Sequence, residues 1–184
     1  MEKEALLPES LVVRCQTGDM SAAKQLYEQY SKAMYNICLR MMNNAEDAED
    51  MLQEAFYQVF KNIGSYRGES TIGSWIKRIV VNKCINQLKK KKIVLVAADN
   101  IEYAEEERME EDAFKYTVEN VKQAIKYLPD GYRTVLNLYL FENYSHKEIA
   151  ERLGISESTA KTQYMRAKQR VRKIVERTES GSSY

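Results

Sequence analysis

The side chains best suited to chemistry lie near the end of the chain, in residues 157–173, where cations and small polar groups recur along one predicted helix. Lysine and arginine neutralise phosphates, and short polar side chains or amides form hydrogen bonds with base edges. The small polar residues are Ser158, Thr159, Thr162 and Gln163, and the basic residues are Lys161, Arg166, Lys168, Arg170, Arg172 and Lys173. This composition predicts a helix that reads DNA.

Local signals divide residues 144–173 into two helices joined by a tight turn. Ser145 and Glu148 have the spacing of a capping box at the start of the first helix. Gly154 permits the backbone conformation that ends a helix, and Ser156 can cap the next one. The pattern predicts a helix-turn-helix that enters the major groove. The alternative is an ordinary helical hairpin with a basic solvated face.

Residue sets for catalysis or metal binding are not evident in the sequence. His146 is the single histidine, and Cys15, Cys38 and Cys84 are far apart without a C-x-x-C motif. We therefore predict no enzyme activity, no cofactor, no zinc site and no disulfide framework, in a reducing cytoplasm. The segment MEKEALLPES lacks the apolar core of a signal peptide, and no apolar run is long enough to span a membrane, so we expect no membrane insertion.

Charge is segregated along the chain, although the net charge is only +1. Residues 70–92 contain seven basic residues and no acid, and they end in the run from Lys89 to Lys92. That run suits either phosphate attraction or a solvated helix end. Residues 93–112 contain eight acids against Arg108. The basic blocks are suited to nucleic acid, and the acidic block separates them.

Apolar spacing predicts helices throughout the chain. Apolar residues recur at steps of three and four over residues 21–42, again over 48–63, and a third helix is expected over about 74–91. Further helices are expected from about Phe114 to Pro129, then over GYRTVLNLYLFEN to about Asn143. The short piece IVLVA is the only strand-like segment.

We therefore predict an all-α fold of two small helical domains joined by a flexible acidic linker. The expected boundaries are residues 1–92 for the first domain, 93–112 for the linker and 113–184 for the second domain, which contains the helix-turn-helix.

Three motifs, in order, resemble those of extracytoplasmic-function (ECF) sigma factors, a compact branch of the sigma-70 family of bacterial RNA polymerase. The first domain contains AEDAEDMLQEAFYQVF and then SYRGESTIGSWIKRIVVNKCINQLKKK. The second contains LPDGYRTVLNLYLFENYSHKEIAERLGISESTAKTQYMRAKQRVR. The resemblance implies a factor that binds core RNA polymerase, recognises the −10 and −35 promoter elements, and promotes DNA opening and transcription initiation.

In the family, the acidic segment docks on the coiled coil of the polymerase's largest catalytic subunit. The resemblance implies a polar patch around an exposed aromatic anchor. Its residues are Asp47, Asp50, Gln53, Glu54 and Phe56. Considered without the resemblance, acids at a helix start are explained equally well by the helix dipole.

The resemblance also implies two DNA-binding sets, one in each domain. The −10 set is Tyr66, Arg67, Ser70, Thr71, Trp75, Arg78, Asn82, Lys83 and Gln87. The −35 set is Ser158, Thr159, Lys161, Thr162, Gln163, Arg166, Arg170 and Lys173. Stacking and cationic tracking would capture single-stranded DNA. A core position is the alternative for Trp75, and Tyr66 is the favoured base contact.

Ser158, Ala160 and Gln163 depart from the usual residues of the family's recognition helix, which affects the promoter sequence but not the class of function. Two other classes remain open. One is a two-domain activator that shares only the helix-turn-helix, and the other is a helix-turn-helix recombinase. The family resemblance further implies an anti-sigma partner. The promoter consensus and the inducing signal do not follow from the sequence.

Overall fold

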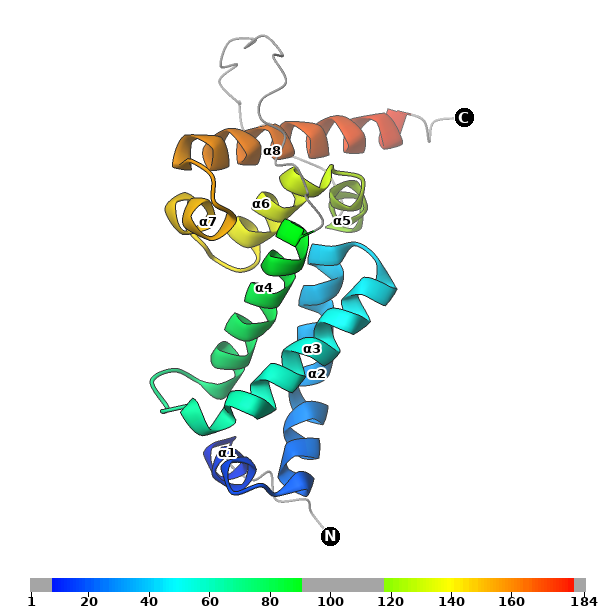
Figure 1. Cartoon of the computed structure of the whole chain (residues 1–184). Coiled ribbons are helices and arrows are strands. Elements are labelled where there is room, and N and C mark those ends of the chain that lie inside the picture. Colours follow the sequence, from blue (N-terminus) through cyan, green and yellow to red (C-terminus); the bar gives the residue numbers. More distant parts are fainter. Residues whose placement is uncertain (1–7, 91–117, 181–184) are drawn as a thin grey trace. The chain divides into compact units, whose positions relative to one another are not determined.

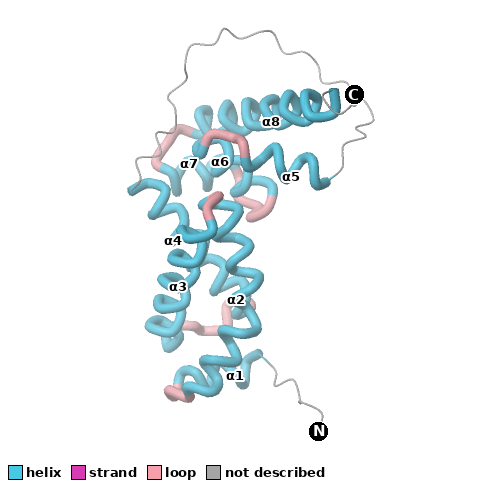
Figure 2. Tube along the Cα trace, turned by 90° about the vertical axis from the view of Figure 1, so that its right-hand side faces the viewer, coloured by secondary structure: helices cyan, strands magenta, loops and turns pink. Residues whose placement is uncertain are grey.

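The computed structural model describes residues 8–90 and 118–180, and within these ranges it contains helices and connecting loops but no strand (Figures 1 and 2). The chain divides into two compact units, up to Lys91 and from Lys92 onward. The all-α prediction is confirmed. The expected linker, the IVLVA segment and the expected helix start at Phe114 lie outside the described residues. Within the described part of the chain, no helix combines the length and apolarity that crossing a membrane requires.

Within residues 8–90, the first unit consists of four α-helices and a short 3₁₀ turn. These are α1 (Pro8–Gln16), α2 (Met20–Met42), α3 (Ala45–Asn62), the 3₁₀ turn Ile63–Ser65, and α4 (Ile72–Lys90). Helices α2, α3 and α4 pack together around fully buried side chains such as Leu26, Val59 and Ile76. The periodicity predicts these three helices to within a few residues, but α1 is an element that the sequence analysis did not identify.

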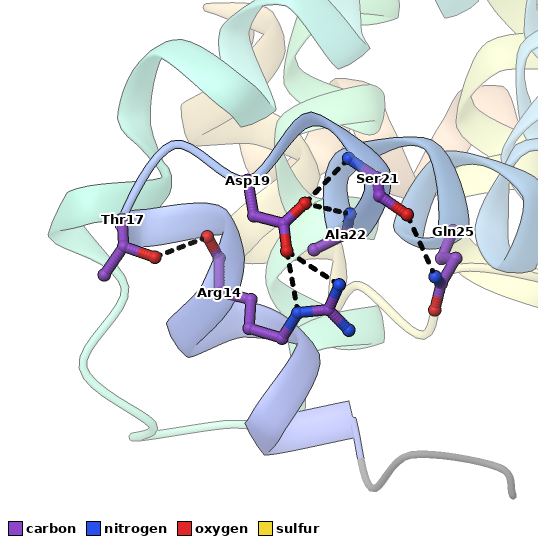
Figure 3. A network of polar contacts seen from close by, with 6 residues as sticks. All are labelled: Arg14, Thr17, Asp19, Ser21, Ala22 and Gln25. Carbon is purple, nitrogen blue, oxygen red and sulfur yellow. Dashed lines mark hydrogen bonds and ion pairs between the residues drawn. The ribbon is translucent and has the colours of Figure 1, made fainter.

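A polar network fixes the corner between α1 and α2 (Figure 3). The Asp19 carboxylate caps α2 by accepting hydrogen bonds from the backbone N–H groups of Ser21 (2.8 Å) and Ala22 (3.1 Å). Arg14, near the end of α1, donates to the same carboxylate at 2.8 Å. The backbone bond from Ala22, followed by the Arg14 bond, lowers the pKa of Asp19. These hydrogen bonds therefore hold the end of α1 against the start of α2.

The second unit contains α5 (Val118–Lys126), α6 (Asp130–Leu140), α7 (His146–Leu153) and α8 (Glu157–Ser180). Helix α5 ends before Pro129 as predicted, whereas α6 ends at Leu140 rather than near Asn143. Asn143 adopts a left-handed conformation (φ 59°), which a helix cannot contain. A cluster that includes Ile125, Leu136 and Ala167 packs α5 and α6 against α8.

The predicted helix-turn-helix is present as α7 and α8. Ser145 accepts a hydrogen bond from the N–H of Glu148, and the Glu148 carboxylate accepts one from the N–H of Ser145, which completes the capping box. Gly154 ends α7 with φ 72°. The Ser156 hydroxyl accepts from the N–H of Thr159 at 3.0 Å and so caps α8. Each cap supplies a partner for a backbone N–H that the helix leaves unpaired.

Candidate nucleic-acid interface

The first turns of α8 present a polar and cationic surface. Ser158 and Lys161 are exposed, whereas Thr159, Thr162 and Arg166 are partly buried. Two of these side chains are held locally in the free protein: Thr162 donates to the carbonyl of Ser158 at 2.9 Å, and Lys161 forms an ion pair with Glu157 at 2.7 Å. Because the Lys161 pair is exposed, it is weak. A DNA phosphate can therefore displace it at small cost.

Gln163 does not belong to this surface. Its side chain is only 3% exposed, and neither amide atom has a hydrogen-bond partner. It lies on the side of α8 that also buries Ala160 and Ala167, facing the interior of the unit. The expected contact of Gln163 with a base edge is therefore wrong for this conformation. The sequence pattern could not reveal this, because glutamine is ordinarily an exposed residue.

Three aromatic rings hold the start of α7 against α6 and α8. His146 stacks on Tyr139 with ring centroids 4.5 Å apart and an interplanar angle of 14°. Tyr164 of α8 lies 4.4 Å from Tyr139 and 5.3 Å from His146. Burial, followed by the charge of Lys161, lowers the pKa of His146. The single histidine therefore packs the helix-turn-helix against two tyrosine rings, a contact that the sequence did not predict.

Two of the later cations of α8 contact aromatic rings of their own unit. Arg170 lies over the Tyr132 ring at 5.2 Å, and Lys168 lies over the Tyr164 ring at 5.8 Å. Both remain exposed, as does Lys173. Their charges are therefore available to phosphates while their stems cover apolar surface.

In the first unit, the loop before α4 brings aromatic side chains together. The Tyr66 hydroxyl donates to the carbonyl of Ser70 at 2.5 Å. The Tyr66 and Trp75 rings meet edge to face, with centroids 5.6 Å apart. Both residues are only partly buried, so Trp75 is not a fully buried core residue. The pair forms a platform of the kind that stacks with an unpaired base.

Two side chains that the sequence analysis did not select support this platform. Gln16 of α1 donates to the carbonyls of Ile63 (3.1 Å) and Tyr66 (3.2 Å), which fastens the loop to the first helix. Tyr30 of α2 lies near the loop, and its pKa is raised by burial and then by the charge of Tyr66. Sequence spacing could not reveal these contacts, because Gln16 is 50 residues from Tyr66.

The remaining −10 candidates lie on the loop and on α4. Arg67, Ser70, Thr71 and Arg78 are exposed, and Asn82, Lys83 and Gln87 are partly buried. Thr71 accepts from the N–H of Ser74 at 3.3 Å at the start of α4. Lys83 pairs with Glu54 of α3 at 3.0 Å. This ion pair links the predicted −10 set to the predicted polymerase-binding set.

The acidic face of α3 contains four of the five predicted polymerase contacts. Asp50, Gln53 and Glu54 are exposed, and Asp47 is partly buried. Phe56 is only 3% exposed, and it packs edge to face on Tyr27 with centroids 4.8 Å apart. The expectation that Phe56 is an exposed anchor is therefore wrong. The neighbouring Tyr57 is 65% exposed.

Comparison with known proteins identifies both units. The family model described as "Sigma-70 region 2" matches residues 26–93, and "Sigma-70, region 4" matches residues 119–171. The chain is 31% identical over 175 residues to the ECF RNA polymerase sigma factor SigW of Bacillus subtilis, covering 85% of this chain and 90% of the relative. It is 29% identical over 183 residues to the RNA polymerase sigma-H factor of Pseudomonas aeruginosa, covering 91% and 93%.

Solved structures show the same fold. The sigma factor RpoE of Bartonella quintana, in complex with the anti-sigma factor NepR, matches with a TM-score of 0.52 at 18% identity and covers 83% of this chain and 96% of its own. CnrH, in complex with the cytosolic domain of CnrY, matches with a TM-score of 0.50 at 16% identity and covers 92% and 97%.

The chain has the two helical regions that define a sigma-70 family protein. Within that family it belongs to the ECF RNA polymerase sigma factors, which act in promoter recognition and transcription initiation. The match to region 2 accounts for the first half of the chain, which the activator and recombinase alternatives leave unexplained.

Proposed function

We propose that this sigma factor divides promoter recognition between its two units. Residues 1–92 bind core polymerase and the −10 element, residues 93–112 link the units, and residues 113–184 bind the −35 element. The observation that carries the proposal is the capped turn before α8, which presents exposed Ser158 and Lys161 on the first turns of a basic helix. RNA synthesis itself is performed by the polymerase, so this chain supplies specificity rather than catalysis.

The polymerase-binding patch on α3 consists of Asp47, Asp50, Gln53 and Glu54, with Tyr57 in place of the buried Phe56. Residues 47, 50, 54 and 57 follow one another at steps of three and four, which brings them onto one face of the helix. Tyr57 is exposed and can supply apolar contact area, while the acids select a basic partner surface.

At the −10 element, the Tyr66–Trp75 platform stacks with an unpaired base, and the polar and basic side chains of α4 follow the strand. The partial exposure of both rings supports this role, because a base can stack only on aromatic surface that solvent reaches. Arg67 and Arg78 are exposed and suited to phosphates. Asn82, Lys83 and Gln87 supply hydrogen-bonding groups along the same helix.

An anti-sigma protein is the regulatory partner that we propose, and the cytoplasm is the proposed location. One matched solved structure is a sigma factor in complex with an anti-sigma factor, and another is CnrH in complex with the cytosolic domain of CnrY. A partner that covers α3 would block the proposed polymerase binding, and one that covers α8 would block the proposed −35 binding. Co-purification of the full chain from its own cells, followed by mass spectrometry, would identify such a protein.

Transcription in a defined system tests the function directly. Core polymerase with the full chain should initiate at specific sites in a library of genomic fragments, whereas core alone should not. Tyr66→Ala should bind the same promoter but lose permanganate-reactive thymines near the start site, because strand capture is impaired. Phe60→Ala would report general loss of packing, since Phe60 lies beside Phe56. Absence of site-specific initiation by the wild-type chain would refute the proposed function.

A further inference from the structure

Two cysteine thiols meet inside the first unit. Cys38 of α2 and Cys84 of α4 are 46 residues apart in sequence, yet their sulfur atoms lie 3.9 Å from each other. Both side chains are fully buried. The third cysteine, Cys15 of α1, is free and lies outside this pair. The fold therefore brings together two thiols that the sequence spacing gives no reason to associate.

We propose that Cys38 and Cys84 form a disulfide-competent pair that peroxide oxidises to a bond between α2 and α4. The Cys38 thiolate attacks one oxygen of hydrogen peroxide, hydroxide leaves, and Cys38 becomes a sulfenic acid. The Cys84 thiol then attacks the Cys38 sulfur, a water molecule leaves, and the S–S bond forms. In sum, two thiols and one peroxide give one disulfide and two waters.

The surroundings favour Cys38 as the attacking sulfur. The hydrogen bond from the Cys84 thiol lowers the pKa of Cys38, against the opposing effect of burial. Burial, followed by the charge of Asp19, raises the pKa of Cys15. A raised pKa leaves less thiolate, so Cys15 is less reactive toward peroxide than Cys38. Because both paired thiols are shielded from water, oxidation requires a local opening of α4 from α2 and should be slower than oxidation of an exposed thiol.

The bond would act more directly on α4, which carries the proposed −10 contacts, than on α3, which contains neither cysteine. A disulfide needs sulfur atoms about 2.0 Å apart, so the two sulfurs must approach each other and the neighbouring side chains must repack. Cys84 lies on α4 between Lys83 and Gln87, whereas the acidic face belongs to α3. Because the core is close-packed, the movement of the Cys84 sulfur shifts the neighbouring part of α4. We therefore expect the oxidised chain to bind core polymerase but to open promoters poorly. This consequence rests on the proposed function, but the cross-link does not.

Peptide mapping of the full wild-type chain tests the cross-link without any variant. The reduced chain is treated with hydrogen peroxide, remaining thiols are alkylated, and the chain is digested with trypsin without reduction. Peptide 33–40, which contains Cys38, should be recovered joined to peptide 84–89, which contains Cys84. Peptide 15–24, which contains Cys15, should be recovered alkylated and unlinked. Recovery of both paired thiols unlinked, or a link to Cys15, would overturn the proposal.

The functional consequence is tested with matched variants. Peroxide should reduce open-complex formation by the wild-type chain and by Cys15→Ala, and dithiothreitol should restore it. Cys84→Ala and Cys38→Ala should be insensitive to peroxide, and Cys84→Ser provides a second variant if alanine impairs folding. If the cross-linked wild-type chain formed open promoter complexes as well as the reduced chain does, the proposed effect on α4 would be wrong. Lack of opening by the reduced chain would instead count against the proposed function.

Discussion

Phe56 and Tyr57 are adjacent in α3 but point in different directions, because successive residues of an α-helix are turned by about 100°. Phe56 packs inside the unit on Tyr27, and Tyr57 faces solvent. Phe56→Ala should therefore lower the free energy of unfolding by about 3 to 5 kcal/mol. Tyr57→Ala should leave stability nearly unchanged and weaken binding to core polymerase by about 1 to 2 kcal/mol. Urea denaturation and a core-binding titration measure the two effects.

Gln58, next to this pair and partly buried, offers a control position on the same helix. Gln58→Ala should change neither stability nor core affinity by more than about 0.5 kcal/mol. If Tyr57→Ala bound the core as tightly as this control does, Tyr57 would have no place in the interface.

Arg166 and Lys173 lie seven positions apart on α8, roughly two turns of helix. Arg166 is near enough to the helix start to approach a base, whereas Lys173 is exposed further along and suits a phosphate. Arg166→Ala should cost about 1 to 3 kcal/mol at the best promoter and relax preference at one or two base pairs. Lys173→Ala should weaken binding to all sequences alike. It should also reduce the slope of log affinity against log salt concentration by about one unit.

Competition binding of the full chain with core polymerase, over a randomised −35 library at two salt concentrations, separates these effects. If Arg166→Ala lost the same affinity for every member of the library, Arg166 would contact a phosphate rather than a base.

At the scale of elements, the capping box before α7 gives the helix-turn-helix a defined pH dependence. The backbone hydrogen bond from Ser145, followed by its hydroxyl, lowers the pKa of Glu148. The stability that this carboxylate contributes is present above its unfolded pKa of about 4.3 and is lost as the pH falls through the lower pKa of the folded state. Hydrogen exchange of the α7 amides at several pH values should show this loss.

Glu148→Gln is the matched control, because the amide can still accept a hydrogen bond but does not titrate in this range. In this variant, the pH-dependent part of the α7 hydrogen exchange should become smaller. The pH dependence that remains comes from other carboxylates such as Glu157, whose pKa is also lowered by Lys161. An identical pH dependence in both proteins would mean that the capping box is not the titrating element.

Helices were more predictable from the sequence than the direction in which single side chains face. Apolar periodicity and caps identified α2, α3, α4, α7 and α8, because these signals act within a few residues. The motif that resembles the family included Phe56 and Gln163 in contact sets, but tertiary packing buries both. The support of Tyr66 by Gln16 depends on a contact across 50 residues, which no local pattern encodes.

At the scale of the whole molecule, the proposed division of promoter recognition requires both units to act on one DNA. The two units have separate cores, and the family models match one region in each. The predicted linker of about 20 residues can reach at most about 70 Å, near two turns of duplex. The chain length between the units is therefore sufficient for both to engage the same promoter.

We predict that the acidity of residues 93–112 gives the linker a role beyond its length. Its excess of negative charge resembles that of nucleic acid, which suits a basic channel of the polymerase, whereas a passive linker needs only solvation. Reversing Glu105, Glu106 and Glu107 to lysine should therefore reduce transcription by the holoenzyme while each unit still binds DNA. The matched control replaces the same residues with glutamine, which removes charge without reversing it and should have a smaller effect. Transcription yield and DNA affinity are measured for both variants at two salt concentrations, because screening should reduce the difference between them. Full initiation by the lysine variant would show that the linker acts only as a tether.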